Sequence, residues 1–106
     1  MKIKLAKKEL IHFVGIGGIG MSGLALIMKE LGFRVQGSDI SLNNNVKRLK
    51  RRKIIIFLNH NKSNLKNVSA VVYSSAIKKN NPEIIQSKKL GIPIVSRADM
   101  LAELMR

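Results

Sequence analysis

Short apolar runs alternate with segments of helical periodicity along the chain. The apolar runs lie at residues 10–14, 33–38, 54–58, 70–73 and 92–95, and each predicts a strand. After the first run, apolar residues recur at steps of three and four, which predicts an amphipathic helix. Its inward residues are Met21, Leu24, Ala25, Met28 and Leu31, and Gly32 follows them in the position typical of a helix end. Strands that alternate with helices in this way favour parallel pairing in an α/β sheet.

Three further helices complete the pattern. A short basic helix is expected at residues 46–52 and a last helix at 98–105, and residues 61–67 form a loop or a short helix. Pro82 suits the first position of another helix, with Glu83 in its first turn and Gly91 past its end. The sequence therefore predicts an open, Rossmann-like and mostly parallel sheet of about five strands, with helices on both faces.

Two strands carry signals about their place in this sheet. The continuous apolar run at 54–58 predicts a strand that is buried on both faces. Pro93 interrupts the run at 92–95 and removes a backbone donor, which predicts an edge position for that strand. Ligands of such sheets bind outside the carboxyl ends of the strands, at the point where the strand order reverses.

Length and composition limit the possible classes of protein. A chain of 106 residues predicts one domain over residues 1–106, and the lack of cysteine excludes a disulfide scaffold, a zinc finger and a thiol nucleophile. The apolar run that follows the lysines at the start of the chain is short and rich in glycine. We therefore expect neither a signal peptide nor a membrane span there.

The charge is strongly positive and predicts attraction to anions. Twenty Lys and Arg residues face six Asp and Glu residues, which gives a net charge of +14. The four aromatic residues all lie inside apolar runs, which argues against base stacking on nucleic acid. The basic run at 47–53 is interpreted as a solvated helix face with Val46 and Leu49 turned inward. The nine asparagines are interpreted as part of a general preference for Lys and Asn at exposed positions.

A glycine motif at residues 15–20 is the main candidate for a binding site. The sequence Gly-Ile-Gly-Gly-Ile-Gly matches G-x-G-x-x-G, directly after a predicted strand and at the start of a predicted helix. Gly15 permits a tight turn, Gly17 lets the backbone approach a diphosphate, and Gly20 allows close packing of helix on strand. We expect free amides from Gly18 through Ser22 to point at the anion, along the positive end of the helix dipole.

Other polar residues are expected at the same edge of the sheet. Asp39 lies 19 residues after Gly20, close to the spacing of about 20 for a carboxylate that accepts a ribose hydroxyl, although a turn role is the alternative. Ser74, Ser75 and Ala76 follow the fourth strand and would either reach the nucleotide or satisfy local backbone.

The two histidines have different expected roles. His12 lies inside the first strand and is interpreted as a packed or hydrogen-bonded core residue. His60 follows the third strand, where it would contact a base or ribose or else remain solvated. Neither has carboxylate or cysteine partners at metal-ligand spacing, so no metal site is predicted.

Several kinds of catalytic machinery are missing from the sequence. The glycine loop continues into Met21 and Ser22 with no lysine, so it is not a P-loop for a triphosphate. The chain has neither a catalytic triad nor paired carboxylates. We therefore expect no catalysis by this chain alone, and the glycine motif with Asp39 would equally serve an NAD(P)-binding domain.

Longer motifs point to a family. Residues 12–23, 37–39, 74–77, 81–83 and 97–105 resemble, in order and spacing, the amino-terminal domain of the Mur ligases, in particular those that join L-alanine to UDP-N-acetylmuramate. The resemblance implies a bacterial cytoplasmic enzyme of peptidoglycan synthesis, which uses ATP and Mg²⁺ to activate the muramyl carboxylate. It also implies a three-domain parent, in which this chain is the isolated substrate-binding domain and ends before the P-loop.

The resemblance also implies roles for particular residues. The diphosphate would be held by the loop from Gly17 to Ser22, that is Gly17, Gly18, Ile19, Gly20, Met21 and Ser22. Asp39 would bind a ribose or nearby hydroxyl, His60 with Ser74, Ser75, Ala76 and Ile77 would form the nucleotide pocket, and Arg97 would approach the sugar or its carboxylate. The expected partners are UDP-N-acetylmuramate and the remaining domains of the parent, with no nucleic acid and no membrane. The alternatives are an NAD(P)-binding domain and a charge-driven nucleic-acid binder.

Overall fold

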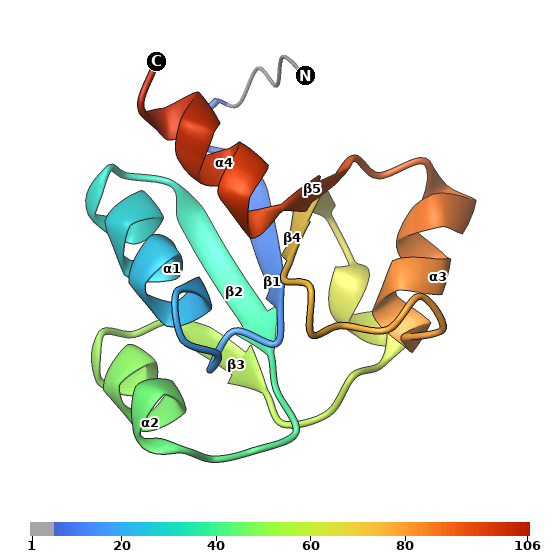
Figure 1. Ribbon diagram of the computed structural model, residues 1–106, viewed down its shortest axis with the longest axis horizontal. Helices are drawn as coiled ribbons and strands as arrows, with labels where there is room; N and C mark the ends of the chain where they lie inside the picture. Colours follow the sequence, from blue (N-terminus) through green and yellow to red (C-terminus); the bar gives the residue numbers. More distant parts are fainter. Residues whose placement is uncertain (1–5) are drawn as a thin grey trace.

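A five-stranded parallel sheet forms the centre of the computed structural model, which describes residues 6–106 (Figure 1). The strands are β1 (Leu10–Val14), β2 (Arg34–Ser38), β3 (Ile55–Phe57), β4 (Val68–Tyr73) and β5 (Ile94–Ser96). They lie in the order β3-β2-β1-β4-β5, and every neighbouring pair is parallel. The order therefore reverses between β1 and β4, so the carboxyl ends of these two strands meet at the switch point of the sheet.

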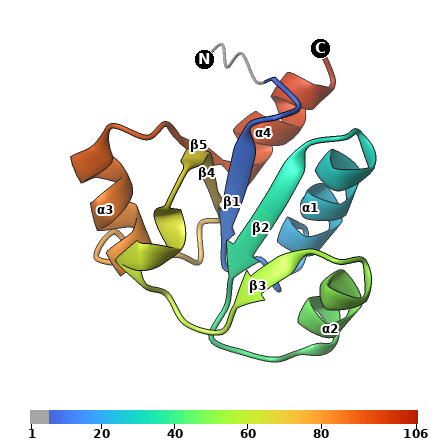
Figure 2. The same cartoon turned by 180° about the vertical axis from the view of Figure 1, so that it is seen from behind.

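Helices cover both faces of the sheet, as Figure 2 shows from behind. On one face lie α1 (Met21–Glu30), α2 (Asn44–Arg51) and α4 (Arg97–Leu104), and on the other lie α3 (Pro82–Leu90) and the short 3₁₀ helix η1 (Lys62–Leu65). The predicted fold class is confirmed. Residues 1–5, which begin the lysine-rich start of the chain, lie outside the described residues.

The side chains of the strands separate into two layers. Ile11 and Phe13 of β1 join the large core beneath α1, whereas Val14 joins the smaller core beneath α3. Because strand side chains alternate between faces, the α3 side of β1 and β2 also receives His12, Gln36 and Ser38. All three are buried, so this side carries a polar cluster within the fold.

The prediction for one of the two edge strands is confirmed, and the prediction for the other is wrong. β5 is an edge strand, as Pro93 predicted. The prediction that the run at 54–58 is buried on both faces was wrong, because only one face of β3, which is the opposite edge strand, is covered. Ile54 and Ile56 pack into the core on the α2 side, but Ile55 is 64% exposed. A continuous apolar run indicates hydrophobic side chains, but it does not indicate whether other elements cover both faces of the strand.

Asparagines begin three of the helical segments. The side chains of Asn43, Asn61 and Asn81 accept hydrogen bonds from backbone amides two or three residues ahead, at the starts of α2, η1 and α3. The interpretation of the asparagines as general surface residues was therefore incomplete. The predicted helix at 46–52 also begins two residues late, because Asn43 caps a helix that begins at Asn44. The predicted helix ends at Gly32 and Gly91 are confirmed by φ angles of +99° and +70°.

Candidate functional site

The glycine loop joins β1 to α1 at the switch point of the sheet. Gly15 and Gly20 have φ angles of +76° and +79°, a region that favours glycine. The backbone N–H groups of Gly15 and Ile16 both donate to the carbonyl of Ser38, at 2.8 and 3.0 Å. These bonds fix the loop to the end of β2.

Gly17 is enclosed by the chain and does not offer an open approach. Its N–H donates to Oδ2 of Asp39 at 2.8 Å, and its carbonyl accepts from the side chains of Asn43 and Asn45. A Cβ at this position would lie 2.6 Å from Cγ2 of Val46. The residue must be glycine because α2 and its preceding loop pack against it, whereas the sequence predicted that Gly17 lets the backbone approach a diphosphate.

The amides expected to be free are only partly so. Gly18 N–H donates to the carbonyl of Gly15 at 3.0 Å, and Ser22 N–H donates to the carbonyl of Gly18 at 3.1 Å. Within residues 6–106, the amides of Ile19, Gly20 and Met21 make no hydrogen bond, and no side chain caps α1. Of these three amides, those of Ile19 and Gly20 belong to exposed residues at the positive end of the α1 dipole, whereas Met21 is buried.

These amides lie beside a groove of about 450 Å³ at the carboxyl ends of β4 and β5. Its lining residues come from three segments: Gly18, Ile19, Tyr73, Ser74, Ser75, Ala76, Ser96, Arg97 and Ala98. The side chain of Arg97 passes over Gly20, since Cδ lies 3.2 Å and Nε 3.4 Å from the point where a Cβ of Gly20 would be. Arg97 forms no ion pair with another described residue. The groove thus combines a cation with free amides and suits an anion.

Seven of the thirteen predicted site residues do not line this groove: Gly17, Gly20, Met21 and Ser22 of the glycine loop, and Asp39, Ile77 and His60. The Asp39 carboxylate accepts from Gly17 N–H and, at 3.0 Å, from Ser41 N–H, which is the turn role named as the alternative. Ile77 lies on the α3 side of the sheet, where it packs against the smaller core. His60 lines a separate hollow of about 410 Å³ beside α3.

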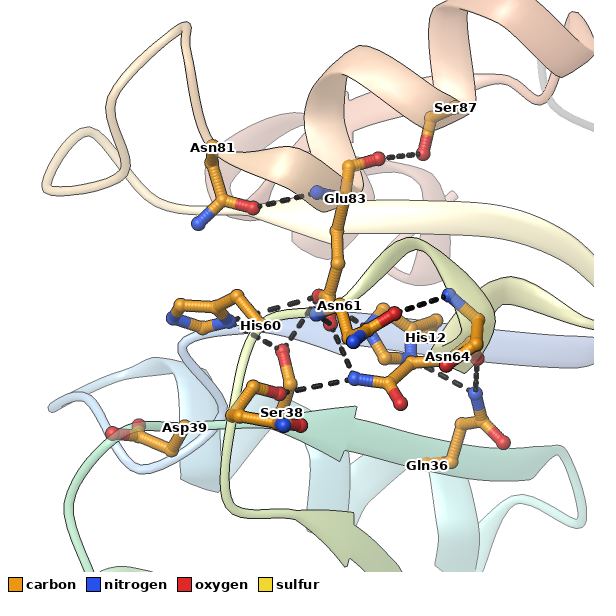
Figure 3. Close-up of polar contacts among 12 residues, drawn as sticks. His12, Gln36, Ser38, Asp39, His60, Asn61, Asn64, Asn81, Glu83 and Ser87 are labelled. Carbon is orange, nitrogen blue, oxygen red and sulfur yellow. Dashed lines mark hydrogen bonds and ion pairs between the residues drawn. The ribbon is translucent and has the colours of Figure 1, made fainter.

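A buried carboxylate on the α3 side was not recognised from the sequence (Figure 3). Glu83 is fully buried, and its Oε1 accepts from His12 Nε2 at 2.7 Å and from Ser38 Oγ at 2.6 Å. Its Oε2 accepts from Asn64 Nδ2 at 2.7 Å and from Asn61 N–H at 3.1 Å. The interpretation of His12 as a hydrogen-bonded core residue is confirmed. A signal was present, because the face that α3 covers carries His12 of β1 and, at alternate positions of β2, Gln36 and Ser38.

Hydrogen bonds keep this carboxylate ionised. Burial by itself raises the pKa of Glu83, but the hydrogen bonds from His12, Ser38 and Asn64 outweigh it. The net result is a pKa below the ordinary value of 4.5.

The free energy of unfolding should depend on pH through this group. A lowered pKa in the folded state adds stability that is fully present above pH 4.5 and is lost as the pH falls through the folded pKa. We expect Glu83→Gln to remove this component, so that the difference in unfolding free energy between the two proteins shrinks on acidification. Urea unfolding at pH 7 and at lower pH measures it, and a constant difference would contradict it.

Within residues 6–106, no helix is long and apolar enough to cross a membrane. The same residues contain no group of three or more His, Cys, Asp or Glu side chains that could hold a metal ion.

Known proteins resemble this chain over nearly its whole length. A curated UDP-N-acetylmuramate--L-alanine ligase of Pelagibacter ubique is 60% identical over 105 residues, which cover 99% of this chain and 23% of that protein. A ligase of the same name from Rickettsia typhi is 62% identical over 96 residues, which cover 91% of this chain and 19% of that protein. The chain therefore spans about a fifth of the length of the curated relatives it matches.

Solved structures share the fold as well. The UDP-N-acetylmuramate-alanine ligase of Thermotoga maritima superposes with a TM-score of 0.86 at 36% identity, covering 90% of this chain and 22% of that one. The UDP-N-acetylmuramate:L-alanyl-gamma-D-glutamyl-meso-diaminopimelate ligase of Neisseria meningitides gives a TM-score of 0.84 at 29% identity, covering 91% and 31%. Among protein families, the family model described as "Mur ligase family, catalytic domain" matches residues 10–106. The match to this model extends over most of the chain, which belongs to the Mur ligase family.

Proposed function

We propose that this chain binds UDP-N-acetylmuramate, as the amino-terminal domain of a longer, three-domain ligase that joins L-alanine to that substrate. The observation that carries the proposal is the groove lined by Ile19 and Arg97, next to which Gly20 lies against the Arg97 side chain, with the amides of Ile19 and Gly20 making no hydrogen bond within residues 6–106. Free amides at a helix start, with a nearby guanidinium, are a common way to hold a diphosphate.

The names of the relatives support the choice of ligand. The ligases from Thermotoga maritima and Neisseria meningitides differ in the compound that is joined, but both names contain UDP-N-acetylmuramate. The part of each that matches this chain has the same fold, which supports binding of the shared substrate by this part. L-Alanine as the second substrate is supported by the curated relatives at about 60% identity.

The proposed contacts follow the placement of the groove residues. The diphosphate lies on the amides at the start of α1, Ser74, Ser75 and Ala76 line its side, and Arg97 approaches the sugar or its carboxylate. Gly17, Gly18 and Ser22 shape the loop through their internal hydrogen bonds. Each Asp39 oxygen accepts one bond within the chain and keeps a lone pair, with which it can accept a ribose hydroxyl. In this proposal the chain binds and orients the nucleotide and performs no chemical step on it.

ATP and Mg²⁺ do not fit the described residues. The glycine loop carries no P-loop lysine, and residues 6–106 offer no cluster of carboxylates for the ion. The proposal therefore assigns both to the remaining domains of the parent ligase, where ATP would supply the activating phosphoryl group. A bacterial cytoplasmic location is part of the same proposal.

Titration calorimetry tests the proposal with three ligands. UDP-N-acetylmuramate and UDP should bind to the chain, and NADH should not. Tight binding of NADH without a response to the uridine ligands would instead favour an NAD(P)-binding domain.

Arg97→Ala should weaken binding of UDP-N-acetylmuramate by roughly ten- to a hundredfold, because a hydrogen bond to a charged group is lost. Arg106→Ala is the matched control. It removes the same charge from an exposed arginine whose partner, Glu103, lies on the same terminal helix. Equal weakening by the two substitutions would indicate a general effect of net charge and contradict the assigned role of Arg97.

A further inference from the structure

A second hollow, of about 350 Å³, lies on the α3 side of the sheet, between α3 and the end of β4. Its walls come from α3, from β5 and from the segment that joins β4 to α3, all of which can be followed in Figure 1. Tyr73 and Ser75 line both this hollow and the groove beside the glycine loop, but the remaining lining residues differ. The proposed function makes no use of this second hollow.

The floor of the second hollow is apolar. Four of its lining side chains belong to the smaller core beneath α3 or pack against it: Tyr73, Ile77, Ile84 and Ile94. Ile84 is buried, whereas the other three are only partly buried. The hollow therefore offers apolar surface against which a ligand can bury a ring or a branched chain, and such burial is favourable.

Backbone hydrogen bonds fix the wall between β4 and α3. Ile77 N–H donates to the carbonyl of Ser74 at 3.0 Å, and Asn81 N–H donates to the carbonyl of Lys78 at 3.1 Å, so two turns follow one another. Cδ1 of Ile77 also lies 3.0 Å from the point where a Cβ of Gly15 would be, which packs this wall against the glycine loop. The hollow thus has a defined shape before a ligand binds, and this lowers the entropic cost of binding.

Three lysines surround the apolar floor. Lys78 and Lys79 come from the joining segment, and Lys88 lies on α3, on the same face as Ile84 and one turn after it. No Asp or Glu lines the hollow, and none of the three lysines forms an ion pair with another described residue. The neighbouring carboxylate of Glu83 is fully buried within its own cluster. The hollow therefore combines positive charge with apolar surface.

We infer that the second hollow is a further binding site, which takes a small organic anion: a ring-sized apolar body that carries a phosphate or carboxylate group. The apolar body packs against Tyr73 and the isoleucines, and the anionic group meets the lysine ammonium groups and the hydroxyl of Ser75. The volume lies within the range of about 300–1,000 Å³ that is usual for sites of small molecules. The inference does not rest on the proposed function, because it concerns different side chains.

Titration with 1-naphthyl phosphate tests the chemical class of the ligand. This probe carries both an apolar body and a charged group, whereas inorganic phosphate and 1-naphthol each carry only one of the two. Amide ¹H–¹⁵N spectra at physiological salt follow the binding. We expect 1-naphthyl phosphate to bind roughly tenfold or more tightly than either control compound. Equal affinities for 1-naphthyl phosphate and inorganic phosphate would show that the apolar floor contributes nothing, and would overturn the inference.

The same spectra locate the bound probe. The largest shift changes should occur at residues that line the second hollow and not the groove, in particular Ile77, Lys79, Ile84 and Lys88. Changes confined to Ile19, Gly20 and Arg97 would place the probe beside the glycine loop and contradict the second site.

Replacement of the three lysines by glutamine tests the role of the charge. The triple variant Lys78→Gln, Lys79→Gln, Lys88→Gln should raise the Kd for 1-naphthyl phosphate by roughly tenfold, as expected for the loss of three exposed charge contacts. The matched control is the triple variant Lys47→Gln, Lys50→Gln, Lys89→Gln, which loses the same charge from exposed lysines outside the hollow. Equal weakening by the two variants would indicate a general effect of net charge and overturn the inference.

Arg97→Ala separates the second site from the proposed function. This variant should leave the Kd for 1-naphthyl phosphate unchanged, although it should weaken the binding of UDP-N-acetylmuramate. A parallel loss of affinity for both ligands would show that they share the groove beside the glycine loop, and would overturn the second site alone. Failure of the unchanged chain to bind uridine ligands, with 1-naphthyl phosphate still bound at the lysines, would overturn the proposed function and support the second site.

Discussion

Replacement of Glu83 by alanine should lower the free energy of unfolding by about 3–5 kcal/mol. The substitution leaves four donors without their acceptor: His12 Nε2, Ser38 Oγ, Asn64 Nδ2 and the amide of Asn61. These groups come from β1, β2, η1 and the loop before η1, so the loss affects the contact of α3 with the whole sheet. Urea unfolding monitored by circular dichroism measures the effect.

Glu30→Ala is the control for the loss of a glutamate. Glu30 pairs with Arg52 at 2.7 Å, but both side chains are more than half exposed. An exposed pair of this kind contributes about 0.2–1 kcal/mol, so the control should change stability little. Similar losses for Glu30→Ala and Glu83→Ala would show that the buried cluster does not carry the stability assigned to it.

Gly17→Val should weaken the binding of uridine ligands by on the order of tenfold or more and also destabilise the fold by about 1–3 kcal/mol. Its Cβ would lie 2.6 Å from Val46 Cγ2 and 2.9 Å from Asp39 Oδ2, so both α2 and the Asp39 carboxylate must move. The glycine pattern by itself predicts a loss of binding with the fold largely intact. The packing around Gly17 adds the loss of stability.

Gly23→Ala provides the comparison for stability. Gly23 lies in α1, and a Cβ there would meet no atom within 4 Å. An alanine in a helix should stabilise the chain by roughly 0.5–1 kcal/mol relative to glycine. Calorimetric titration and thermal unfolding of the two variants test both effects. Wild-type affinity for UDP in Gly17→Val would contradict the role of the loop in binding.

Local signals predicted most of the elements. Pro82 and Gly91 mark the two ends of α3, and β1 has the bounds that its apolar run predicts. These features depend on a few neighbouring residues, so the sequence contains them directly. The edge position of β3 was missed because it depends on the order of strands, which is set by contacts between distant segments.

The candidate site was predictable in outline only. The sequence placed the glycine loop, the Ser74–Ser75–Ala76 turn and Asp39 at one edge of the sheet, which the structure shows. The sequence did not reveal that the Asp39 carboxylate accepts a hydrogen bond from the amide of Gly17, or that His60 lies on the α3 side of the sheet. The Glu83 cluster was missed for a related reason. His12 and Glu83 are separated by 71 residues, and the periodicity of the sequence indicates which residues are buried but not which of them are in contact.

The exposed edge of the sheet has a consequence for the behaviour of the chain in solution. Within residues 6–106, β3 has a neighbouring strand on one side only, and Ile55 is exposed, which would allow strands of two molecules to pair. The adjacent α2 presents exposed lysines and arginines, and the whole chain has a net charge of +14. Two copies approaching edge to edge therefore repel each other, so the excess of basic residues protects against aggregation, and concentrated salt weakens that protection.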